Sequence, residues 1–216
     1  IDRVWEILDN KNERDLVRVQ CVKTLADLKK KGALIRNMVP RFNKMLSMKT
    51  EQPRVRRAVA HIFSQIISPE KRDIEGQRVI STMANILYDK EESAYIKKTV
   101  FKALSTFGIR SDKLLDVSMD VLKDPGSPLK QAAVDALYNI ARTNHELTDR
   151  RVGDIMERIA LSETEATALR AKCLKVLGYI IRNKEGQSFS DWRKAISSSL
   201  EAGDREIVKG ACYAIA

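Results

Sequence analysis

The stretch that decides the fold is 124–141, DPGSPLKQAAVDALYNIA. Its Asp-Pro-Gly opening is typical of a turn, Ser127 is a residue type that caps helices, and Pro128 suits the first turn of a helix. The apolar residues that follow recur every three or four positions, which places them on one helical face. They are Leu129, Ala133, Ala136, Leu137 and Ile140.

The same frame recurs along the chain as an aliphatic residue, a basic residue, two variable positions and a small or β-branched residue. Its six instances start at Val17, Val55, Ile96, Leu129, Leu169 and Val208. Successive starts lie 33 to 41 residues apart, a spacing typical of helical repeats. Upstream of each frame is a second amphipathic stretch, so each repeat is predicted to be two helices joined by a short polar turn.

Neither helix of such a pair can bury its apolar stripe alone, so neighbouring pairs must stack into a continuous core. The predicted repeats span approximately 1–30, 33–68, 74–109, 111–143, 148–183 and 188–216, in a single domain. The second upstream stretch, marked by Leu34, Met38, Phe42 and Met45, contains Pro40, which should kink or restart that helix. With no initiator Met and a periodic pattern at both ends, the chain is predicted to be a fragment of a longer one.

This pattern resembles the HEAT repeat family over nearly the whole chain. The resemblance implies an all-α fold, a right-handed α-solenoid of about six helix pairs, with the second helix of each pair on a concave surface. The armadillo family is a weaker match, because it usually carries an inward-facing Asn on its last helix. The corresponding positions here are Asp27, Gln65, Thr106, Asn139 and Tyr179, of which only one fits.

Two further series follow the repeat. Cys21, Cys173 and Cys212 each lie four residues after a frame start, and we expect all three to be small core residues. The basic residues beside the frame starts are Arg18, Arg56, Lys97, Lys130, Arg170 and Lys209. Acids in the preceding turns are Asp15, Glu51, Glu91, Asp124, Glu165 and Asp204. In HEAT proteins such a basic residue bonds a carboxylate of a neighbouring turn, which implies a structural role here.

A second set of basic residues lies at positions 2, 6, 9 and 13 after the frame starts, on the side of the helix that faces away from the predicted core. We call it the basic stripe, and it consists of Lys23, Lys30, Arg57, His61, Lys98, Lys102, Arg142, Lys175 and Arg182. Ser64, Ser105 and Tyr138 fill much of the rest, and Asp135 is its single acid. The stripe is either a solvated face or a cradle for carboxylates or phosphates.

The sequence offers little for catalysis or metal binding. His61 and His145 lie in different repeats without acids or cysteines at ligand spacing, so no metal and no cofactor is expected. DNA glycosylases built on similar repeats keep an acid in a basic groove, and Asp135 lies one turn from Tyr138, but the flanking tryptophans are missing. The prediction is that the chain is not an enzyme and has no small-molecule substrate.

Composition narrows the class of partner. The net charge is +10, no apolar run approaches the ~20 residues that cross a bilayer, and three scattered cysteines form no disulfide framework. We therefore expect a cytoplasmic or nuclear scaffold that binds a protein partner through an acidic segment. Nucleic acid held by its phosphate backbone is the alternative, and membrane attachment is disfavoured because no basic amphipathic helix with large exposed apolar residues stands out.

Overall fold

The computed structural model describes residues 1–67, 74–106, 112–143, 150–183 and 189–216, which form twelve helices and no strand. The first six are α1 (Asp2–Asp9), α2 (Asp15–Lys30), α3 (Met38–Ser47), α4 (Pro53–Ile66), α5 (Ile74–Tyr88) and α6 (Ala94–Thr106). The others are α7 (Asp112–Lys123), α8 (Lys130–Thr143), α9 (Arg150–Leu161), α10 (Thr167–Asn183), α11 (Ser190–Leu200) and α12 (Arg205–Ile215). None of these helices is long and apolar enough to span a bilayer.

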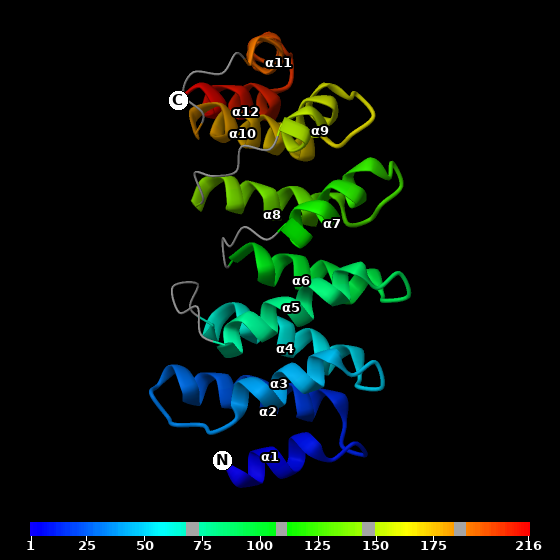
Figure 1. Cartoon of the computed structure of the whole chain (residues 1–216), viewed down its shortest axis with the longest axis vertical. Coiled ribbons are helices and arrows are strands. Elements are labelled where there is room, and N and C mark those ends of the chain that lie inside the picture. Colours follow the sequence, from blue (N-terminus) through cyan, green and yellow to red (C-terminus); the bar gives the residue numbers. More distant parts are fainter. Residues whose placement is uncertain (68–73, 107–111, 144–149, 184–188) are drawn as a thin grey trace. The chain divides into compact units, whose positions relative to one another are not determined.

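The helices fall into two compact units, Ile1–Phe107 (unit 1) and Gly108–Ala216 (unit 2). In unit 1 each odd-numbered helix packs on the even-numbered helix that follows it, and α2, α4 and α6 pack on one another in succession (Figure 1). In unit 2, α8, α10 and α12 do the same. Stacked antiparallel pairs are the arrangement of an α-solenoid, which confirms the predicted fold class.

Proline positions explain two helix starts. Pro53 opens α4, where its missing N–H costs no hydrogen bond. Pro40 lies in the first turn of α3, so that helix begins at Met38, as the predicted restart requires. Leu34 lies before the helix and is 77% exposed, so its prediction as a residue of this helix's apolar face was wrong.

The core of unit 1 contains a row of aromatic rings. Trp5 packs edge-on against Phe42 with ring centroids 5.6 Å apart, and Phe42 packs against Phe63 at 6.3 Å. In unit 2, Trp192 is buried and stacks on Phe189 at 4.5 Å. Both tryptophans are thus core residues.

The basic residues beside the frame starts tie helices and repeats together. The guanidinium of Arg18 is fully buried; its Nε donates to the Leu8 carbonyl at 2.8 Å, and its two terminal nitrogens donate to Glu51 at 2.7 and 2.9 Å. Arg56 repeats this pattern with the Leu46 carbonyl at 2.9 Å and Glu92 at 2.6 Å. Each guanidinium therefore joins its own pair to the turn of the next pair.

The remaining members follow the pattern in part. Lys130 pairs with Glu165 of the next turn, and Arg170 Nε donates to the Ala160 carbonyl at 3.0 Å. Lys209 is exposed and pairs with Glu206 of its own helix at 2.8 Å, since no described helix follows α12. The structural interpretation of this series is confirmed for the members that reach a neighbouring turn.

The three cysteines are not equivalent. Cys21 and Cys173 are buried, as predicted. Cys212 is exposed, and its predicted burial was wrong, because no described helix covers that face of α12.

Candidate functional site

The basic stripe lies on the second helices of the pairs. In unit 1 its members are on α2, α4 and α6, and in unit 2 they are on α8 and α10. Their side chains are exposed, except that of Lys175, which is half-buried. Ser105, expected on the same face, is buried instead, and its hydroxyl is satisfied without water because it donates to the Lys102 carbonyl at 2.8 Å.

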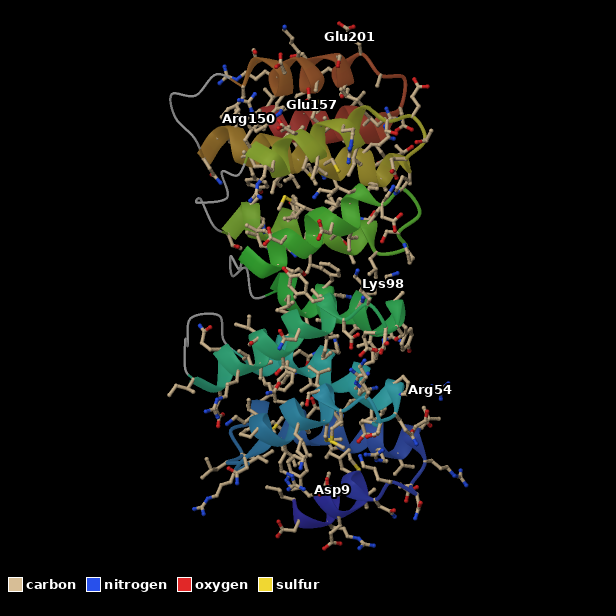
Figure 2. The ribbon with its side chains drawn as sticks, turned by 45° about the vertical axis from the view of Figure 1, so that its right-hand side comes forward. Asp9, Arg54, Lys98, Arg150, Glu157 and Glu201 are labelled. Atoms are coloured by element: carbon tan, nitrogen blue, oxygen red, sulfur yellow. The ribbon has the colours of Figure 1, made fainter. Side chains whose placement is uncertain are left out.

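A hollow of about 400 Å³ opens on unit 1 across α2, α4 and α6, and we call it the cationic hollow. It is lined by Leu16, Val19 and Lys23 of α2, by Arg54, Arg57, Ala58 and His61 of α4, and by Tyr95, Thr99 and Lys102 of α6. Four stripe residues thus share one concavity. Lys30 and Lys98 lie outside the lining, and Figure 2 shows Lys98 and Arg54 on the same side of unit 1.

Arg57 is held in place by an aromatic ring. Its guanidinium carbon lies 4.4 Å from the centre of the Tyr95 ring, and it also donates to the Tyr95 hydroxyl. A guanidinium has five N–H donors, so most of them remain available to a ligand. Arg54, by contrast, pairs with Asp15 at 3.1 Å and is already neutralised.

His61 is part of a chain of hydrogen bonds that defines its tautomer. Lys30 donates to the Gln65 Oε1, so the Gln65 amide nitrogen faces His61, 2.9 Å from its Nε2. An amide nitrogen only donates, so the His61 Nε2 accepts and the Nδ1 carries the proton. Burial first, and then the positive charges of Lys102, Lys30, Arg57 and Lys23, lower the pKa of His61, which leaves the ring neutral at pH 7.

The charge of the cationic hollow is not balanced from within. No carboxylate among the residues that the structure describes forms an ion pair with Lys23, Arg57 or Lys102. Two nearby cations do have side-chain partners. Arg54, which lines the hollow, pairs with a carboxylate, and Lys30, which lies outside the lining, donates to the neutral Gln65. The hollow therefore offers three unneutralised cations and one neutral N–H donor to an anion.

In unit 2, two of the three stripe residues, Lys175 and Arg182, lie over a row of tyrosine rings. Tyr138, Tyr179 and Tyr213 form a row across α8, α10 and α12, with successive ring centroids 5.7 and 6.0 Å apart. Arg182 lies 4.7 Å from the Tyr179 ring, and Lys175 lies 5.1 Å from the Tyr213 ring. These cation–π contacts stabilise the row and hold the two cations over it.

Asp135, the single acid of the stripe, is engaged within unit 2. It accepts from Lys172 Nζ at 2.7 Å and from Gln131 Nε2 at 3.0 Å. Lys172 also lies 5.1 Å from the Tyr138 ring. The carboxylate is thus neutralised by a partner from the next pair and forms a structural link between α8 and α10.

In the described part of the chain, no group of three histidine, cysteine or acidic side chains is placed to hold a metal ion. His145 lies outside the described residues, so its predicted isolation has no structural counterpart.

The sequence reasoning missed Tyr95, Thr99 and Gln65. Tyr95 directly precedes the frame start Ile96, and Thr99 and Lys102 follow it at spacings of four and three residues, so the three share a helical face. This spacing is the signal that could have identified Tyr95 and Thr99. Gln65 carries no such signal, because its role depends on Lys30 from the preceding pair.

Comparison with known proteins supports the fold. No family model and no curated protein matches the sequence. An engineered protein of known structure is similar over 100% of this chain and 96% of its own, with 15% identity and a TM-score of 0.61. Human deoxyhypusine hydroxylase in complex with glycerol (13% identity, coverage 98% and 83%, TM-score 0.42) and a second engineered protein (13%, 99% and 66%, 0.41) are more distant.

These likenesses correct one expectation. The prediction that the chain is not an enzyme is contradicted, since human deoxyhypusine hydroxylase, a solved structure similar to this chain, is an enzyme. At this identity and TM-score the likeness assigns no activity to the present chain, and the first engineered protein shows the fold alone.

Proposed function

We propose that this chain is a HEAT-like binding module of the cytoplasm or nucleus that holds an acidic segment of a partner protein in the cationic hollow. The observation that supports it is the set of three cations, Lys23, Arg57 and Lys102, which line one concavity from three helices without a carboxylate partner among the described residues. Such charges are costly to bring together and are stabilised when an anion binds.

The border of the hollow favours a peptide over a phosphate backbone. Leu16 is 64% exposed and Tyr95 is 48% exposed, and both line the same hollow as the cations. A peptide can place an apolar side chain against Leu16 while its carboxylates meet the lysines. A nucleic-acid backbone has no apolar group of that kind to bury.

Nucleic acid is the second candidate, supported by the same three cations and by the net charge of +10. In that case the affinity should fall with salt on a slope that reports the number of phosphates contacted. Only one tyrosine lines the hollow, so single-stranded bases would find little to stack on.

The test compares two variants of equal charge. Lys23→Gln with Lys102→Gln removes two cations from the hollow, and Lys29→Gln with Lys90→Gln removes two exposed cations of unit 1 outside it. Fluorescence anisotropy would measure binding of a labelled oligoglutamate peptide and of a duplex DNA at two salt concentrations. We expect the first variant to lose about tenfold in affinity for the peptide, and the control less than about twofold.

Equal losses in the two variants would show that only overall charge matters and would overturn the proposed site. Binding of DNA without binding of the peptide would replace the first candidate by the second.

A further inference from the structure

The cationic hollow has a centre and two flanks, and they differ in chemistry. The centre is α4, which carries Arg57 and His61 one turn apart. The flanks are Lys23 on α2 and Lys102 on α6, which pack against α4 from either side. We propose that the hollow selects a protein segment with a phosphoryl group at its centre and acidic residues about three positions to either side, a specificity that rests on the proposed function.

Arg57 supports a phosphoryl group at the centre. Because the Tyr95 ring and hydroxyl already hold its guanidinium, little side-chain entropy is lost when its remaining N–H groups bind. A guanidinium fork matches two oxygens of a phosphoryl group, and such charge-assisted pairs are about twice as strong as neutral hydrogen bonds.

His61 supplies a donor that suits the third oxygen. Its Nε2 is occupied by Gln65, so the Nδ1–H is the donor that the neutral ring offers. A phosphoryl group carries about −1.5 to −2 charges and three acceptor oxygens, whereas a carboxylate has one charge and two oxygens. The centre therefore has more donors and more positive charge than one carboxylate can satisfy.

The flanking lysines set the spacing. Packed helices lie about 8–10 Å apart, and a segment in the polyproline II conformation has three residues per turn and advances about 3.1 Å per residue. Three residues of such a segment span the distance from α4 to α2 or to α6, and side chains three positions apart point to the same side. An acidic residue three positions before the phosphorylated residue and another three positions after it would meet Lys23 and Lys102.

Three peptides that differ only in their central residue test the proposed preference for a phosphoryl group. Each carries glutamate three positions to either side of a central residue, which is phosphoserine, glutamate or serine. Anisotropy should show that the phosphoserine peptide binds about tenfold more tightly than the glutamate peptide, and the serine peptide should bind most weakly. The ³¹P resonance of the phosphoserine peptide should also shift when the wild-type chain is added.

The Arg57→Lys variant distinguishes the effect of the guanidinium geometry from the effect of its positive charge. It keeps the cation and loses the bidentate geometry, so the preference for phosphoserine over glutamate should fall to about threefold or less while affinity for the glutamate peptide changes little. Arg36→Lys, at an exposed arginine of unit 1 outside the hollow, is the matched control and should leave the preference unchanged.

Equal affinity for the phosphoserine and glutamate peptides would overturn the phosphoryl selection and leave acidic-segment binding standing. A preference that survives Arg57→Lys undiminished would also overturn it, because the guanidinium would then not be the group that reads the phosphoryl oxygens. If none of the three peptides binds, the selection and the proposed function fall together.

Discussion

Glu51 shows how a single carboxylate joins two repeats. Its side chain is buried and accepts from Arg18 and Lys11, and from the backbone N–H of Gln52 at 2.8 Å. Burial alone would raise the pKa of Glu51, but these hydrogen bonds outweigh it and lower the pKa to about 2. The carboxylate is therefore charged at any pH where the protein is ordinarily studied.

Glu51→Gln should destabilise the chain by about 3 kcal/mol at pH 7, because it leaves the buried Arg18 guanidinium without its counter-charge. Urea unfolding followed by circular dichroism would measure the loss. The folded-state pKa of Glu51 lies below its ordinary value of 4.5, so its stabilisation is present above about pH 4.5 and is lost as the pH falls toward 2. The wild type and the variant should converge over that range, and a constant gap would contradict this linkage.

The cysteines should differ in reactivity. Cys212 is exposed, whereas Cys173 is fully buried, and burial and the nearby Glu165 raise the pKa of the Cys173 thiol. In the native chain we expect a maleimide or a disulfide reagent to modify Cys212 rapidly, and Cys21 and Cys173 only after denaturant is added. Mass spectrometry of the labelled peptides would identify the sites. Rapid native labelling of Cys173 would contradict the packing of α10.

At the scale of elements, two glycines allow α10 and α12 to pack closely. A Cβ at Gly210 would lie 2.6 Å from the Ala171 carbonyl oxygen and 2.9 Å from its Cα, and one at Gly178 would lie 2.5 Å from the Ala214 Cα. The obstacles are backbone atoms, which a rotamer change cannot move. The contact between these helices therefore depends on glycine at both positions.

Gly210→Ala should destabilise the chain by about 1–3 kcal/mol, because the forced separation of α10 and α12 outweighs the gain of about 1 kcal/mol in helix propensity. Gly203→Ala is the control, since a Cβ there meets no atom within 4 Å. Thermal unfolding of both variants would measure the difference. A variant at Gly210 as stable as the wild type would show that the two helices can move apart at little cost.

At the scale of the whole molecule, tertiary contacts are local along the chain. In unit 1, α2 packs on α4 and α4 on α6, and in unit 2, α8 packs on α10 and α10 on α12. In such an arrangement stability is approximately a sum of terms between neighbours. A substitution in one helix should therefore destabilise first the helices that pack against it.

Hydrogen exchange of the Glu51→Gln variant tests this locality. We expect faster amide exchange in α2 and α4, which flank the lost pair, and little change in α10 and α12. Mass spectrometry of peptic fragments would resolve the helices, and the Gly210→Ala variant should show the opposite distribution. An equal acceleration throughout the chain would contradict a sum of neighbour terms.

The sequence by itself determined the helices, their pairing and the side of the second helices that carries the basic stripe, because these follow from a periodicity of 3.6 residues within one stretch of chain. It also placed Cys21 and Cys173 in the core. Only the tertiary structure decided that Lys23, Arg57, His61 and Lys102 share one hollow, and that Gln65 orients His61. It also separated Cys212 from the other cysteines. These features depend on which helices lie side by side. That arrangement comes from packing between repeats, and the periodicity of a single stretch of sequence does not specify it.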